Sequence, residues 1–161
     1  MKRVSIMIAG ASAACIRLAA SPAAAKCRVV GDSVAVGLGA ALRPCSVSAS
    51  VGLSASNAAR RVGRNDGWVS VALGSNDFPK RMSSAQRQQS DANVRRALSR
   101  IEAAAGKRVI VIVPANGGRG TVESWLSSHG LRSLSFSAGS DGIHPKTYGE
   151  LARRVRAMMA H

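Results

Sequence analysis

Arg108-Val109-Ile110-Val111-Ile112-Val113 is the most hydrophobic run of the chain. A strand that is apolar at every position is typical of a parallel sheet covered on both faces, because neither set of alternating side chains then meets water. The run therefore predicts a central parallel strand with helices on both sides.

The sequence on either side alternates between strand and helix patterns. We expect further strands over 27–30, 46–51, 68–73 and 131–136, and helices over 34–42, 55–62, 84–105, 121–129 and 146–159. The longest expected helix has its apolar residues at three- and four-residue spacing. This alternation predicts an α/β fold with a parallel sheet and right-handed crossovers. Such sheets bind ligands beyond the carboxyl ends of their strands.

The first 25 residues have the pattern of a secretory signal peptide. Lys2 and Arg3 precede an apolar stretch of small residues, and Ala23-Ala24-Ala25 then offers a cleavage site. The apolar stretch is shorter than the roughly 20 residues that a membrane-spanning helix needs. We therefore expect a signal peptide over 1–25, one domain over 26–161, and export to the periplasm or the medium without stable membrane insertion. The alternative is a cytoplasmic chain.

The composition is strongly basic, with 23 Lys and Arg residues against 8 Asp and Glu, and a net charge of +15. A basic surface favours anionic partners, such as a charged envelope polymer or phospholipid headgroups. We do not expect a nucleic-acid partner, since no RNA-recognition, zinc or basic-helix motif is present and few aromatic residues could stack on bases. No His/Cys cluster has metal-ligand spacing, so we expect neither a metal nor a cofactor. We also expect the protein to be a monomer.

Three short polar motifs follow strands or precede the last helix: Gly31-Asp32-Ser33, Gly74-Ser75-Asn76-Asp77 and Asp141-Gly142-Ile143-His144-Pro145. A Ser hydroxyl becomes an effective nucleophile when a His removes its proton, and a carboxylate must orient that His. Together the motifs predict Ser33 as nucleophile, His144 as base and Asp141 as its partner. Pro145 would begin the last helix, where proline fits.

Two further groups in these motifs could bind the negative charge that develops on an ester oxygen. Backbone N–H groups near Ser33, at a helix start, can help to stabilise this charge, and the Asn76 amide offers a side-chain donor. We expect Asp32 and Asp77 to be structural.

In these motifs the chain resembles the SGNH, or GDSL-type, hydrolase family, over essentially all of residues 26–161. The resemblance implies a flavodoxin-like three-layer α/β/α sandwich with a five-stranded parallel sheet in the order 2-1-3-4-5. It also implies cleavage of carboxylic esters, sometimes thioesters, without a metal. Ser33, Asp141 and His144 match the family's triad, and Ser33 and Asn76 match two of its oxyanion donors.

The family's remaining oxyanion donor falls in the run Val51-Gly52-Leu53-Ser54-Ala55-Ser56-Asn57. Here Ala55 stands at the usual glycine position, and its backbone N–H is the expected donor, with Gly52 as the alternative. We also expect Gly52, Gly74 and Asn116 to contact substrate at the same edge. For Asn116, in Pro114-Ala115-Asn116-Gly117-Gly118, a simple turn is an equal alternative.

The resemblance also bears on Cys27 and Cys45, which lie at the start of the first strand and just before the second. In the family these strands are parallel neighbours, so the two Cα atoms would approach disulfide distance at the amino-terminal edge of the sheet. An exported compartment allows the bond. The alternative is two buried thiols.

The sequence thus predicts a serine esterase that forms an acyl-enzyme on short acyl groups, such as O-acetyl groups of envelope polysaccharide. The enzyme alternatives are a lysophospholipase or a thioesterase. The alternative from another class is a non-catalytic envelope carbohydrate-binding module on the same fold.

Overall fold

The structure is a computed structural model that describes residues 26–64 and 67–161. The predicted signal peptide, residues 1–25, lies outside the described residues. Five strands form one fully parallel sheet: β1 (Cys27–Gly31), β2 (Ser46–Ala49), β3 (Trp68–Ala72), β4 (Val109–Ile112) and β5 (Arg132–Leu134). Their order is β2-β1-β3-β4-β5, which confirms the expected flavodoxin-like arrangement.

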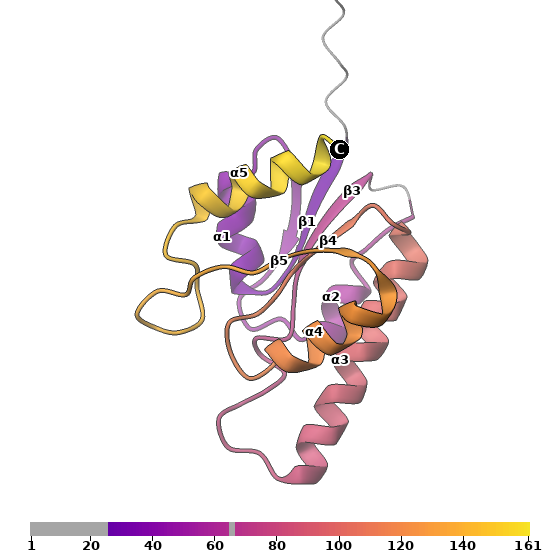
Figure 1. Cartoon of the computed structure of the whole chain (residues 1–161), viewed down its shortest axis with the longest axis vertical. Coiled ribbons are helices and arrows are strands. Elements are labelled where there is room, and N and C mark those ends of the chain that lie inside the picture. Colours follow the sequence, from indigo (N-terminus) through magenta and orange to yellow (C-terminus); the bar gives the residue numbers. More distant parts are fainter. Residues whose placement is uncertain (1–25, 65–66) are drawn as a thin grey trace, which may run out of the picture.

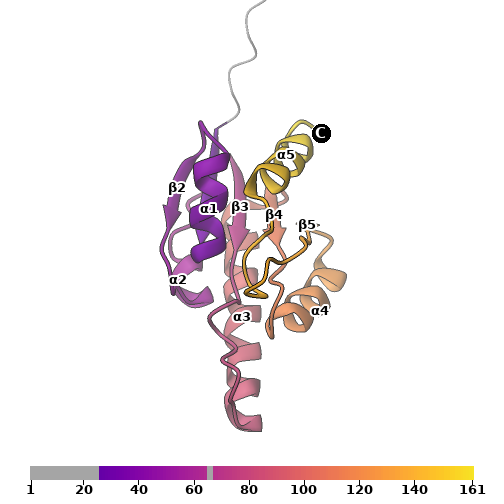
Figure 2. The same cartoon turned by 90° about the vertical axis from the view of Figure 1, so that its left-hand side faces the viewer.

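Helices cover both faces of the sheet (Figures 1 and 2). One face packs against α1 (Ser33–Ala41) and α5 (Tyr148–Met159), and the other against α2 (Ala55–Ala59), α3 (Ser84–Ala105) and α4 (Arg119–His129). The protein is therefore a three-layer α/β/α sandwich with a core on each side of the sheet.

The hydrophobic run that predicted the fold lies where expected. In β4, Val109 and Val111 belong to the core under α3 and α4, while Ile110 and Ile112 belong to the core under α1 and α5. Successive strand residues point to opposite faces. Because helices cover both faces of the sheet, all four residues of the strand are buried.

The longest helix, α3, also follows the sequence pattern. It begins at a capping box formed by Ser83 and Gln86, and its buried residues are Val94, Ala97, Leu98 and Ile101. These lie from the middle of the helix onward, while the first turns extend past the sheet (Figure 1). The helix therefore carries exposed polar residues to the edge at which the strands end.

Two expected boundaries are corrected. Helix α5 begins at Tyr148 after the N-cap Thr147, and Pro145 instead pairs with Ala138 in an isolated antiparallel bridge. Helix α2 ends at Ala59 and not at 62. Pro145 is thus part of the loop before α5, and it is buried.

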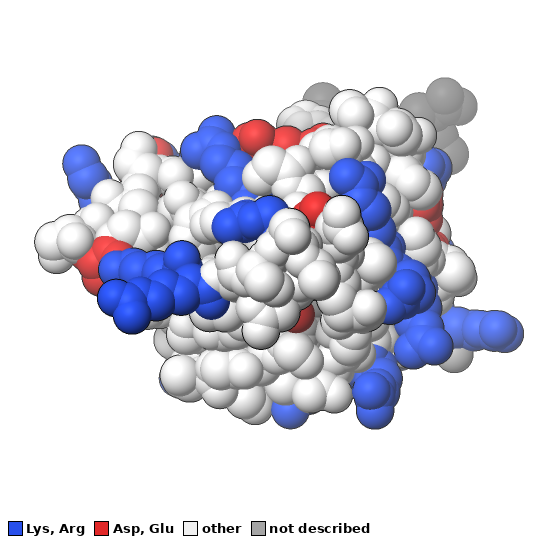
Figure 3. All heavy atoms as spheres, turned by 90° about the horizontal axis from the view of Figure 1, so that it is seen from below, with Lys and Arg blue, Asp and Glu red and all other residues white. Residues whose placement is uncertain are grey.

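The strands all point the same way, toward the lower edge in Figure 2, so their carboxyl ends form one face of the molecule. Figure 3 looks onto that face: Lys and Arg side chains gather around it, with fewer acidic side chains between them. Among residues 26–64 and 67–161, no helix has the length and apolar character that crossing a membrane requires.

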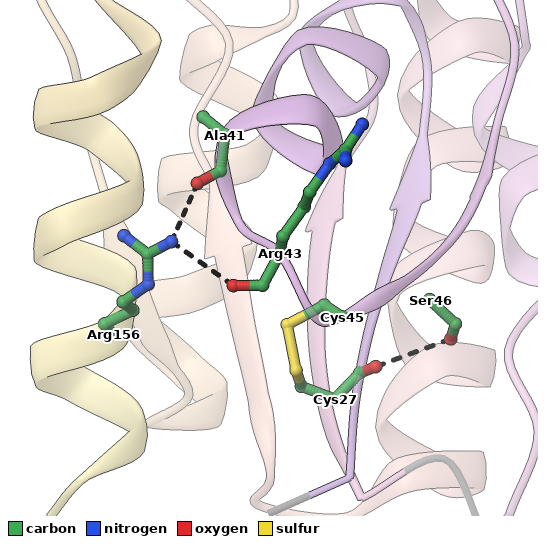
Figure 4. Close-up of a disulfide and its surroundings, with 6 residues drawn as sticks. All are labelled: Cys27, Ala41, Arg43, Cys45, Ser46 and Arg156. Carbon is green, nitrogen blue, oxygen red and sulfur yellow. Dashed lines mark hydrogen bonds between the residues drawn. A yellow bond between two sulfur atoms is a disulfide. The ribbon is translucent and has the colours of Figure 1, made fainter. Parts of the chain in front are cut away.

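Cys27 and Cys45 form a disulfide, with their Cα atoms 4.8 Å apart (Figure 4). The bond lies at the amino-terminal edge of the sheet, where the neighbouring strands β1 and β2 begin, as expected. Beside it, the Ser46 hydroxyl donates to the Cys27 carbonyl, and Arg156 of α5 donates to the carbonyls of Ala41 and Arg43. The disulfide and these hydrogen bonds together tie β1, β2, the end of α1 and α5 to one another at this edge.

Reduction of this disulfide should lower stability. The bond closes a loop of 18 residues, which chain-entropy arguments value at roughly 3 kcal/mol. The protein spanning residues 26–161 should show no free thiol when titrated in denaturant, and reductant should lower its free energy of unfolding in urea. Two free thiols before reduction, or identical urea curves with and without reductant, would contradict this.

Candidate active site

The first part of the site is the sharp connection from β1 to α1. Gly31 has φ +140°, and a Cβ there would lie 1.8 Å from the carbonyl oxygen of Ala72 on β3. Only glycine allows this approach, which also lets the Asp32 N–H donate to the same oxygen at 3.1 Å. Ser33 thus begins α1, where the first N–H groups have no partner within the helix.

Asp32 is fully buried and caps this helix, since its Oδ1 accepts the N–H of Val34 at 3.0 Å. Burial raises the pKa of Asp32, and the hydrogen bonds from Val34 and Ser75 offset only part of that effect. Its role is to cap the start of α1 and so to hold Ser33 in place.

The second part of the site is the loop before α5. Gly139 donates to the carbonyl of His144 at 2.7 Å, and Lys146 donates to that of Ser137 at 3.0 Å, so the loop folds back on itself. Gly142, with φ +70°, makes the turn at its tip. This fold presents Asp141 and His144 on the same side.

Asp141 is held by the turn and by the imidazole together. Its Oδ1 accepts the N–H groups of Ile143 and His144 at 2.9 and 3.0 Å, and its Oδ2 lies 2.5 Å from His144 Nδ1. The hydrogen bond with His144, and then the two backbone N–H groups, hold the pKa of Asp141 well below its usual range. The carboxylate is therefore ionised at neutral pH.

The two parts meet at Ser33. His144 Nε2 lies 2.9 Å from Ser33 Oγ, although the two residues are 111 positions apart in sequence. Ser33, His144 and Asp141 thus form a continuous chain of side-chain contacts. The side chains of His144 and Asp141 are 38% and 49% exposed, so this chain is open to solvent.

The loops after β2 and β3 lie beside this chain. The Asn76 amide donates to the carbonyl of Leu53 at 3.2 Å, and the Ser50 N–H donates to that of Gly31 at 3.0 Å. Asn76 is exposed, and the second hydrogen of its amide is available for another acceptor. Gly52 is exposed as well, with φ +76° and open space around it.

The backbone N–H of Ala55 does not have the oxyanion-binding role that we expected. This N–H donates to both carboxylate oxygens of Asp77, at 3.2 and 3.0 Å. Asp77 thereby caps α2, for which Ser54 provides no side-chain cap. Because its N–H is already taken, Ala55 is not the second backbone donor in this structure, and Gly52 is the remaining candidate in this loop.

Gly74 and Asn116 hold the loops together. Gly74 has φ +95° and is buried, so its expected contact with substrate gives way to a role in the turn after β3. The Asn116 amide donates to the carbonyl of Ser75 at 2.8 Å, which ties the loop after β4 to the loop after β3. Asn116 nevertheless stays partly exposed at the edge.

A groove of about 560 Å³ runs along this edge from the loop that carries Asp141. Its walls come from three loops and the start of α3: Ser75, Phe78, Pro79, Lys80, Arg87, Asn116, Gly117, Asp141, Gly142 and Ile143. Lys80 and Arg87 could not be predicted from the sequence, because no motif marks them and only the folded path of the chain brings them to the groove.

A scan against protein-family models and a search of the curated proteins both find no match to this chain. Within 26–64 and 67–161, no group of three or more His, Cys, Asp or Glu side chains is placed to hold a metal ion.

Proposed function

We propose that the protein is an exported serine esterase that cleaves carboxylic esters through an acyl-enzyme. The observation that carries this proposal is the chain of contacts from Ser33 Oγ through the His144 imidazole to the Asp141 carboxylate. This is the arrangement that acyl transfer by a serine requires. The disulfide and the signal-like residues 1–25 support export, since disulfides persist in oxidising compartments.

In the first half of the reaction, Ser33 Oγ attacks the ester carbonyl carbon while its proton moves to His144 Nε2. Asp141, which stays ionised, stabilises the imidazolium through Nδ1–H. The tetrahedral intermediate collapses, the ester C–O bond breaks, and His144 donates its proton to the leaving alcohol.

In the second half, water attacks the acyl group on Ser33 and gives a proton to His144. Collapse of the second intermediate releases the acid, and the proton returns to Ser33 Oγ. The negative charge on each intermediate is stabilised by the Ser33 N–H, the Asn76 amide and the Gly52 N–H.

The size and exposure of the site favour short acyl groups. The Ser33–His144 pair lies at an edge that is open to solvent, with the His144 side chain 38% exposed, so a long acyl chain held there would stay largely in contact with water. Together with export and the basic surface, this favours O-acetyl groups on an anionic envelope polysaccharide.

The direct test is hydrolysis of p-nitrophenyl esters with acyl chains of two to twelve carbons by protein spanning residues 26–161. We expect turnover with the highest kcat/KM on the acetyl or propionyl ester and a steady decline with chain length. A maximum at long chains would contradict the short-acyl proposal. No turnover of any ester would contradict the esterase proposal and favour a binding module.

The oxyanion role of Asn76 gives a separate prediction. Asn76→Ala should lower kcat by roughly 10²–10³-fold, equivalent to about 2.7–4 kcal/mol, with little change in KM, because the donor acts on charge that develops in the transition state. Asn57→Ala, at an exposed residue of α2, is the matched control and should change neither constant. A rise in KM alone for Asn76→Ala would assign the residue to ground-state binding.

A further inference from the structure

Two basic side chains line the groove beside Asp141. Lys80 comes from the loop after β3 and Arg87 from the first turns of α3, and both side chains are exposed. The groove is also lined by apolar residues, namely Phe78, Pro79 and Ile143, and by Asp141, which contacts His144. A molecule that extends from the reacting centre into the groove would thus meet apolar side chains and two cations.

These two cations have no acidic partner within the part of the chain that the structure describes. Elsewhere, basic side chains do pair: Lys107 with Glu102, and Arg119 with Glu123. The acidic residue that lines the groove, Asp141, has both oxygens engaged by His144 and the backbone of its own turn. The charge of Lys80 and Arg87 is therefore left for a ligand.

We propose that the groove binds an anionic group, a carboxylate or a phosphate, that the ester substrate carries some bonds away from the scissile carbonyl. This rests on the esterase function proposed above and specifies its substrate class. The planar Arg87 guanidinium suits two oxygens of one carboxylate or phosphate, and the Lys80 ammonium adds a point charge. A neutral ester can bind at the same Ser33, but it does not make these two ionic contacts.

The test compares matched esters that differ in charge. For the acyl side, the pair is p-nitrophenyl hydrogen glutarate, which has a free carboxylate, and p-nitrophenyl butyrate. For the alcohol side, it is 4-acetoxybenzoate and its neutral methyl ester. The measured quantity is the ratio of kcat/KM for the anionic ester to that for the neutral one.

In one of the two pairs, the double variant Lys80→Ala/Arg87→Ala should lower this ratio about five- to tenfold, as expected for two solvent-exposed ionic contacts. The pair that responds identifies the side of the ester that occupies the groove. The same ratio in the unsubstituted protein should fall as salt is raised, because salt screens exposed charges.

The control variant Arg100→Ala/Arg153→Ala removes the same charge from exposed sites outside the groove. Arg100 lies on the same helix as Arg87 but 13 residues further along, about 20 Å away. This variant should leave both ratios unchanged. Circular dichroism and thermal unfolding check that all variants are folded.

The outcomes separate the two proposals. If the esters are hydrolysed and neither ratio responds to Lys80→Ala/Arg87→Ala, or the control lowers the ratios equally, the groove assignment is wrong while the esterase stands. If no ester in either pair is hydrolysed, both proposals fall.

Discussion

Ser33→Ala should lower kcat for ester hydrolysis on the order of 10⁶-fold. Without the hydroxyl there is no nucleophile to form the acyl-enzyme, and the remaining oxyanion donors act only on direct attack by water. The measurement is p-nitrophenyl acetate hydrolysis at saturating substrate, with thermal unfolding as the check on the fold.

His144→Ala should cost about as much, and the double variant should cost little more, because the members of such a unit do not act additively. Ser128→Ala, at an exposed serine of α4 far along the chain, is the matched control and should keep full activity. Ser33→Ala with activity near that of the unsubstituted protein would show that another group is the nucleophile.

Asp141→Asn should lower kcat on the order of 10⁴-fold while the fold is retained. Asparagine can keep the Oδ1 contacts to the Ile143 and His144 N–H groups, but its amide would face His144 Nδ1 where Oδ2 now lies. That amide donates a hydrogen, so the imidazole would carry its proton on Nε2 and could no longer accept one from Ser33.

The control for this charge change is Glu123→Gln, which removes an exposed carboxylate on α4 that pairs with Arg119. We expect its kcat to be unchanged. A loss of less than tenfold for Asp141→Asn would show that Asp141 only shapes the loop.

The fold was predictable because its signals are local. The alternation of apolar strands with helices and the both-sided burial of β4 specified the layers, and the β2-β1-β3-β4-β5 order followed from the family resemblance. Pro145 was misplaced because a proline suits both a helix start and a buried loop. The bridge to Ala138, which decides between them, is a contact that no local pattern reveals.

The site residues that belong to short motifs could be predicted from their order along the chain. Ser33, Asp141 and His144 belong to short motifs at the carboxyl edge, and the structure brings them together. The hydrogen bond made by the Ala55 N–H could not be predicted, since its acceptor, the Asp77 carboxylate, lies 22 residues away in the sequence. Lys80 and Arg87 were missed for a similar reason: in a chain with 23 basic residues, only the fold shows which of them border the groove.

The proposed function depends on Ser33 being the nucleophile of an ester hydrolase. The most direct measurement is mass spectrometry of the protein after treatment with a fluorophosphonate, which modifies serines that a neighbouring base activates. We predict one adduct per molecule, localised by fragmentation to Ser33, absent from Ser33→Ala and strongly slowed in His144→Ala. An unmodified Ser33, or a single adduct on another serine, would contradict the account.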